Sequence, residues 1–151
     1  MGFPNNEKAT EGLCFPSVGG NYPTLTAAQL TAAVDMSKIR KAVCVVQAQT
    51  LGAAATVTAK IQGAVTSGGA YTDIPASSAT LVKATDDNKA VILEISAEYL
   101  NALNLSYRYV KFSVSADVSS SATTTVIGTS GREEPVSALN ATGVKTILAL
   151  T

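Results

Sequence analysis

The stretch Ala55–Gln62 alternates strictly between apolar and polar side chains, and this pattern constrains the fold more than any other part of the chain. Every second residue is apolar, namely Ala55, Val57, Ala59 and Ile61. The residues between them are polar, namely Thr56, Thr58, Lys60 and Gln62. Successive side chains of a β-strand point to opposite faces, so a period of two predicts a strand with one buried face. Tyr107–Ala116 repeats the pattern, which predicts Val110, Phe112 and Val114 inside and Tyr109, Lys111 and Ser113 outside.

Further short segments with strand-like composition follow one another along the chain, separated by residues typical of turns. The predicted strands are Lys41–Thr50, Ala70–Ile74, Ala79–Ala84, Lys89–Ile95 and Ala122–Gly128, with turns at 51–53, 67–69, 85–88 and 119–121. Gly68 and Gly69 are expected to supply positive φ angles in a tight turn. Six or seven short strands at this spacing predict an all-β protein, an antiparallel β-sandwich or jelly roll. Because no strand–helix–strand rhythm is present, parallel pairing is not expected.

The chain length of 151 residues favours one domain, which we divide into an arm, a core and a tail. Residues 1–23 hold three of the five prolines and four glycines, which opposes regular structure and predicts an extended N-terminal arm. Residues 24–130 are the predicted β core, in which 24–35 fit a helix or a strand and Ser96 caps a helical turn. Residues 131–151 are the predicted irregular C-terminal tail, which ends in the apolar stretch Val144–Leu150.

The composition removes most kinds of catalytic and metal chemistry. The chain has no His, and its two Cys stand 30 positions apart, so neither a zinc site nor a His-dependent triad is expected. The adjacent carboxylates Asp86-Asp87 and Glu133-Glu134 lie in turn-like segments, where we expect solvated loop charges. Eleven basic and eleven acidic residues cancel, which opposes a nucleic-acid partner. We therefore predict a protein that is not an enzyme and that needs no cofactor or metal.

The cysteines and the apolar segments bear on the compartment. Cys14 lies in a loop-like segment and Cys44 in a Val-rich run, and we expect both thiols to be free in a reducing cytoplasm. The N-terminus lacks the basic and apolar regions of a signal peptide. No apolar stretch approaches the roughly 20 residues that span a bilayer, so no membrane partner is predicted.

Ala, Thr, Val and Ser make up 71 of the 151 residues, while charged residues are only 15% and aromatic residues 5%. A core of small aliphatic side chains gains less from burial, which predicts either a thin core or one completed by neighbouring subunits. Aromatic side chains are the groups best suited to anchor a contact. The predicted interface residues are Phe3, Phe15, Tyr22, Tyr107 and Tyr109. The run from Tyr107 to Tyr109 could also stack on a base or a sugar, but without a basic groove a subunit contact or a sandwich edge is favoured.

Several segments, taken together in their order and spacing, resemble a family of small structural proteins of tailed bacteriophages, the jelly-roll head decoration or cement proteins. The resemblance extends from about Asp35 to Gly128 and is carried by Val34–Lys41, Gln47–Gly52, Ala55–Gln62, Gly68–Ile74 and Tyr107–Phe112. The chain departs from the family at its end, where it has Gly131–Pro135 and a longer tail in place of an aromatic–proline ending.

The resemblance implies a protein made in the bacterial cytoplasm that binds the outer surface of the virion head. Its partners would be the major capsid protein, whose neighbouring subunits it clamps, and two further copies of itself in a homotrimer. Two alternatives stay open: another virion part, such as a tail or fibre module, and a carbohydrate-binding β-sandwich for host attachment. The carbohydrate-binding alternative requires an exposed aromatic platform, for which the candidates are Tyr71, Tyr99, Tyr107 and Tyr109.

Overall fold

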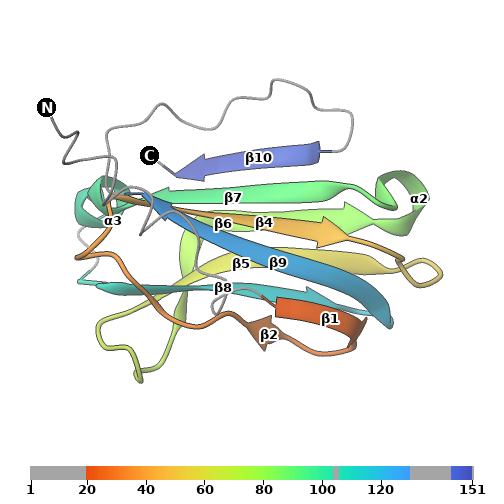
Figure 1. Ribbon diagram of the computed structural model, residues 1–151, viewed down its shortest axis with the longest axis horizontal. Coiled ribbons are helices and arrows are strands. Elements are labelled where there is room, and N and C mark those ends of the chain that lie inside the picture. The colour runs from red at the N-terminus through yellow and green to blue at the C-terminus, as the bar shows by residue number, and fades with distance from the viewer. Residues whose placement is uncertain (1–19, 104–105, 130–143, 151) are drawn as a thin grey trace, which may run out of the picture.

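The chain forms a sandwich of two β-sheets, seen in a computed structural model that describes residues 20–103, 106–129 and 144–150 (Figure 1). Sheet A contains, in spatial order, β1 (Gly20–Leu25), β9 (Ser120–Thr129), β4 (Lys41–Ala48), β7 (Ala90–Ser96) and β10 (Val144–Leu150). Sheet B contains β2 (Gln29–Leu30), β8 (Tyr109–Ala116), β5 (Thr56–Ala64) and β6 (Thr72–Val82), and β3 (Val34–Asp35) also pairs with β8. The prediction of an all-β sandwich is confirmed.

The strand order follows from pairing the first half of the chain with the second half. Strand β1 pairs with β9, β2 and β3 with β8, β4 with β7, and β5 with β6, all antiparallel. This nested set of long-range hairpins, wrapped over two sheets, is the arrangement of a jelly roll. The consequence is that the end of β3 and the start of β8 meet at one end of the sandwich, although 73 positions separate Asp35 from Arg108, the residue before β8.

The core lies between the sheets and is built from the inward-facing residues that the period-two pattern predicts. Val57, Ala59 and Ile61 are fully buried on β5, and Val110, Phe112 and Val114 are buried opposite them on β8. The inner face of β4 contributes Ala42, Cys44 and Val46, all fully buried. The predicted alternation is therefore confirmed on β5 and on β8 except at Ser113, which was predicted outside and is buried. Cys44 lies in the core. Phe112 is the only aromatic ring that is fully buried among the described residues.

Two short helices occupy opposite ends of the sandwich (Figure 1). Helix α3 (Ala97–Ala102) follows β7, and the Ser96 hydroxyl accepts a hydrogen bond from the Tyr99 backbone N–H at 3.0 Å, so the predicted N-cap is confirmed. Helix α2 (Lys83–Asp86) replaces part of the turn predicted at residues 85–88. The expectation of solvated charges is wrong for Asp86, which is buried and accepts the Val82 N–H at 2.9 Å.

The β6 region differs from its prediction. The segments predicted as two strands, Ala70–Ile74 and Ala79–Ala84, form one strand whose register with β5 shifts between Lys60 and Gln62. The extra residues form a bulge in which Ala76 takes a φ of 58°. Gly68 and Gly69 were expected to have positive φ, but no described glycine does. The turn closes through the Gly69 N–H and the Thr66 carbonyl at 3.1 Å, a geometry open to ordinary residues.

Both chain ends contribute more regular structure than predicted. The arm was predicted to reach residue 23, yet β1 begins at Gly20 and pairs with β9. Residues 24–35, which fit helix or strand, form β1, β2 and β3 segments and no helix. The predicted irregular tail contains β10, which pairs parallel with β7, against the expectation of antiparallel pairing alone. Leu150 is buried and Leu148 packs against the core, so apolar burial accounts for this added strand.

Candidate interaction surfaces

The structure separates the residues predicted to make interfaces. Tyr22 lies half-buried on β1 of sheet A and packs against the core, whereas Tyr107 and Tyr109 lie at the start of β8 in sheet B. Phe3 and Phe15 lie outside the described residues. Tyr107 also packs against the core, and its ring lies over Gly63 so closely that a Cβ there would overlap it. Of the three tyrosines predicted to make interfaces, Tyr109 is the one whose side chain lies on an outer face.

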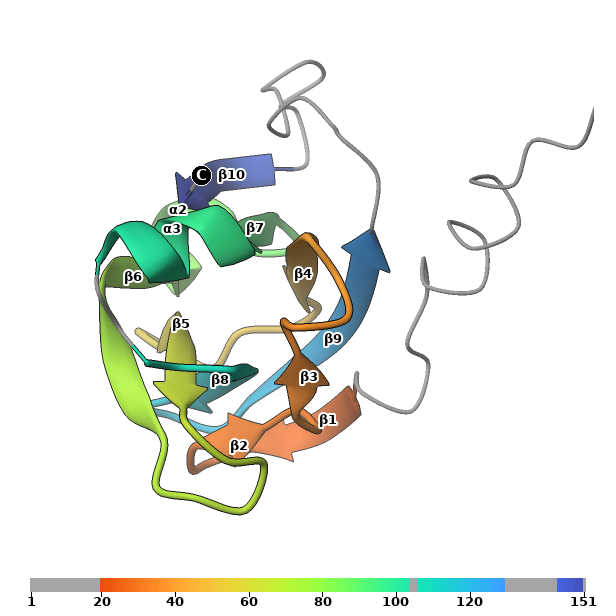
Figure 2. The ribbon, with the colours of Figure 1, turned by 90° about the vertical axis from the view of Figure 1, so that its left-hand side faces the viewer.

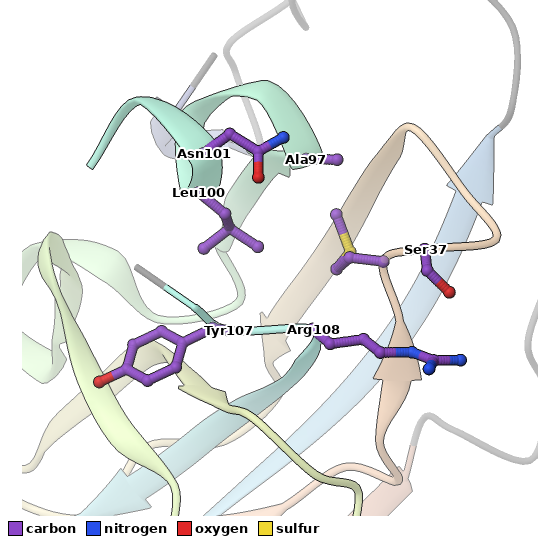
Figure 3. A pocket seen from close by; sticks show the side chains of 7 residues that line it. Ser37, Ala97, Leu100, Asn101, Tyr107 and Arg108 are labelled. Atoms are coloured by element: carbon purple, nitrogen blue, oxygen red, sulfur yellow. The ribbon is translucent and has the colours of Figure 1, made fainter. Parts of the chain in front are cut away.

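Figure 2 views the sandwich from the end that α3 covers. A cavity of about 370 Å³ opens at this end (Figure 3). Its apolar wall comes from Leu100 of α3 and from Met36, both buried, with the Tyr107 ring at one side. The polar lining residues are Ser37, Asn101 and Arg108. In Figure 3 the Arg108 side chain extends away from the Tyr107 ring. The two residues are adjacent in sequence, but their side chains contact different parts of the protein.

Arg108 is held by a two-point ion pair with Asp35 of β3. The Arg108 Nε donates to Asp35 Oδ1 at 2.9 Å and Nη2 donates to Oδ2 at 2.7 Å. The Ser37 backbone N–H and hydroxyl also donate to Oδ1, at 3.0 and 2.7 Å. The hydrogen bonds from Arg108, followed by those from Ser37, hold the pKa of Asp35 well below its usual range despite partial desolvation. Asp35 therefore fixes the start of β8 and neutralises Arg108.

Four side chains at this end of sheet B form what we call the tyrosine–cation cluster: Tyr71, Arg108, Tyr109 and Lys111. The Arg108 guanidinium carbon lies 5.2 Å from the centre of the Tyr109 ring, and Lys111 Nζ lies 4.3 Å from the centre of the Tyr71 ring. Both distances are typical of cation–π contacts. The Tyr71 hydroxyl donates to the Ser67 carbonyl at 2.9 Å. Burial, and then the neighbouring Tyr109, raise the pKa of Tyr71.

Beyond this cluster, the outer side of sheet B is a surface of small hydroxyl side chains, which we call the polar face. Thr58 of β5 stands between Thr80 of β6 and Ser115 of β8. In the next row, Lys60 stands between Ser78 and Ser113. The Asp73 carboxylate accepts from Lys60 Nζ at 2.8 Å and from Gln62 Nε2 at 2.6 Å, and these bonds lower its pKa. Lys60 and Asp73 on this face are thus paired with each other, whereas Lys111 contacts the Tyr71 ring.

The outer side of sheet A is different, and we call it the aliphatic face. Val45 of β4 stands beside Ile92 of β7, which in turn stands beside Ile147 of β10. All three side chains are half-buried and outward-facing, as is Val43. At the α3 end of the same face, Lys41 Nζ lies 2.8 Å from Glu94 Oε1, and the exposed fractions of the two side chains are only 8% and 0%. The sequence did not identify this face, because the Val-rich run Lys41–Thr50 predicted a strand without showing what its outer side meets.

The described residues offer little catalytic chemistry. They contain no group of three or more His, Cys, Asp or Glu residues that could hold a metal ion. Burial raises the pKa of the Cys44 thiol to about 12, so its thiolate does not form at neutral pH; Cys14 lies outside the described residues. Within the same part of the chain, no helix is long and apolar enough to cross a membrane. Neither the known protein-family models nor the curated proteins include one that matches this chain.

Proposed function

We propose that this protein is a non-enzymatic virion component that decorates the outer surface of a tailed-phage head as a homotrimer and stabilises contacts between major capsid subunits. The observation that carries the proposal is the aliphatic face, where Val45, Ile92 and Ile147 form a row that runs from β4 across β7 to the edge strand β10. Permanent subunit interfaces are more hydrophobic than ordinary protein surfaces. A sandwich with such a face is suited to lasting contact with copies of itself.

Two further features support a role in a surface lattice. The jelly-roll strand order agrees with the fold of the decoration proteins that the sequence resembles. The low charge and the many Ala, Thr, Val and Ser residues suit flat surfaces that bury against other chains. We assign the capsid contact to residues 1–19, which include Phe3 and Phe15, because aromatic rings contribute large contact areas when they are buried.

The test adds purified protein to heads that lack it and measures the bound copies after sedimentation. Because β1 begins at Gly20, the truncation removes residues 1–19 only and leaves sheet A intact. We expect the full chain to bind at stoichiometric occupancy, and the truncated chain to fold with a similar melting temperature but to bind at least tenfold more weakly. Failure of the full chain to bind heads would contradict the decoration function. Equal occupancy of both forms would contradict the arm assignment.

The carbohydrate-binding alternative is favoured by one observation: Tyr109, on an outer face, is near enough to Tyr71 to raise its pKa. Of the other aromatic candidates, Tyr99 and Tyr107 pack against the core. One face of the Tyr71 ring is already occupied by Lys111, which leaves less aromatic surface for a sugar. Selective binding to a glycan array, without binding to heads, would favour this alternative. Copurification with tails would favour a tail or fibre module.

A further inference from the structure

We infer that the tyrosine–cation cluster is a docking site for an acidic segment of a partner protein, one that carries a carboxylate next to an apolar or aromatic side chain. The inference does not depend on the proposed role in a phage head, because it follows from the charges and donors that the cluster presents. It names the chemistry of a partner that this face of the protein can recognise.

The first argument is the local balance of charge. Around the cluster, Asp35 is satisfied by Arg108 and Ser37, and Asp73 is satisfied by Lys60 and Gln62. Among the described residues, Lys111 has no carboxylate within ion-pair distance and contacts the Tyr71 ring instead. Three cations and two anions therefore leave one excess positive charge, and it is located at Lys111.

The second argument is the supply of hydrogen-bond donors. The Lys111 ammonium carries three N–H donors. The face of the Tyr71 ring attracts the ammonium but offers no lone pair, so the contact leaves these donors available for hydrogen bonds. The Tyr109 hydroxyl makes no hydrogen bond within the described part of the chain, whereas the Tyr71 hydroxyl is directed to Ser67. A carboxylate accepts up to four hydrogen bonds, so it complements this set of donors.

The third argument is the combination of residue types. Tyr and Arg are enriched at the energetic centres of protein interfaces because they bring large, stiff contact areas with a polar end. Arg108 is already fixed by its two bonds to Asp35, and it stacks over Tyr109, so little side-chain entropy remains to be lost on binding. The two rings can cover an apolar side chain while Lys111 pairs with its acidic neighbour.

The experiment titrates the ¹⁵N-labelled full chain with a blocked Asp-Phe-Glu peptide and, separately, with its uncharged counterpart Asn-Phe-Gln. We expect saturable shifts at the backbone amides of Tyr71, Tyr109 and Lys111 with the acidic peptide. Its affinity should exceed that of the amide peptide at least fivefold, and it should fall as salt is raised. Equal affinities for the two peptides, or shifts spread over the whole surface, would overturn the inference.

Variants identify the cation responsible. Lys111→Gln should weaken binding of the acidic peptide at least fivefold, and Lys111→Arg should retain it. Lys83→Gln is the matched control, because Lys83 lies on α2 at the opposite end of the sandwich. This variant should bind the acidic peptide as the original chain does. Unchanged binding by a folded Lys111→Gln protein would overturn the inference. So would shifts of the same amides by methyl glucoside in the absence of any response to the acidic peptide.

Discussion

The two outer faces of this sandwich are built on strands with the same inner pattern, yet they expose opposite chemistry. On sheet A, the outward positions of adjacent strands are occupied by Val45, Ile92 and Ile147. On sheet B, the corresponding positions hold Thr58, Thr80 and Ser115. Inner positions are constrained by the shared core, whereas outer positions are free to vary with what covers them. The contrast is in keeping with the proposal that the aliphatic face serves self-association and the polar face does not.

The largest expected effect is on self-association. Replacing Ile92 with Lys places a charge at the centre of the aliphatic face, where an interface would bury it at a cost of several kcal/mol. We expect Ile92→Lys to convert the proposed trimer to monomers at micromolar concentration, as measured by sedimentation velocity. Thr58→Lys, the same change at the centre of the polar face, should leave the trimer intact.

The outcomes of this pair separate the possible assignments of the faces. Dissociation by Thr58→Lys alone would assign self-association to the polar face and would contradict its assignment to the aliphatic face. A circular dichroism spectrum and a melting curve for each variant exclude loss of folding as the cause, since both positions point away from the core.

A smaller effect is expected from the ion pairs, one on each face. Glu94→Gln leaves the buried Lys41 ammonium without its carboxylate partner and should lower the free energy of unfolding by about 3 kcal/mol. Asp73→Asn breaks a pair whose side chains are 39% and 48% exposed, and should cost under about 1 kcal/mol. Urea unfolding of both variants measures the difference. Similar losses would show that the aliphatic face does not protect its ion pair from water.

Much of the fold could be predicted from the sequence, because the core depends on local periodicity. The alternation on β5 and β8 indicated correctly which residues face inward, and Ser96 indicated the start of α3. The bulge on β6 could not be predicted, since it depends on the register of β6 against β5, which shifts between Lys60 and Gln62. Nor could β10, because its pairing with β7 depends on contacts between residues about 55 positions apart.

The candidate surfaces were less predictable than the core. Tyr109 could be placed outside from its position in an alternating strand. Its neighbours could not, because the contact of Lys111 with Tyr71 joins β8 to the segment before β6, which only the register of β5 brings together. The aliphatic face was missed for a related reason: a run such as Val43–Val46 is the same in sequence whether its second face meets solvent, a partner or the core.

A third, smaller effect concerns the end of sheet B that carries the cluster. Gly63→Ala would place a Cβ against the Tyr107 ring, and moving this half-buried ring should cost about 2 kcal/mol. Gly68→Ala meets no atom within 4 Å at a residue without positive φ, so it should be neutral or slightly stabilising. Thermal unfolding of the two variants gives the comparison. A neutral Gly63→Ala would mean that Tyr107 is held less firmly than its packing indicates.

The smallest effect is expected for Asp35, the residue that fixes Arg108 beside the cluster. Its pKa is lower in the folded protein than in the unfolded chain, where it is about 3.9. The unfolded chain therefore binds a proton first as the pH falls, so the contribution of Asp35 to stability is complete above about pH 5 and is lost progressively below about pH 4.

In Asp35→Asn this contribution is absent at every pH. We expect the difference in unfolding free energy between the original chain and the variant to be constant near neutral pH and to shrink as the pH falls below about 4. The other carboxylates with lowered pKa, Asp73 and Asp87, are present in both proteins, and their effects cancel in the difference. Urea unfolding across this pH range measures it. A difference that stays constant down to about pH 2.5 would show that the contribution of Asp35 does not come from its ion pair with Arg108.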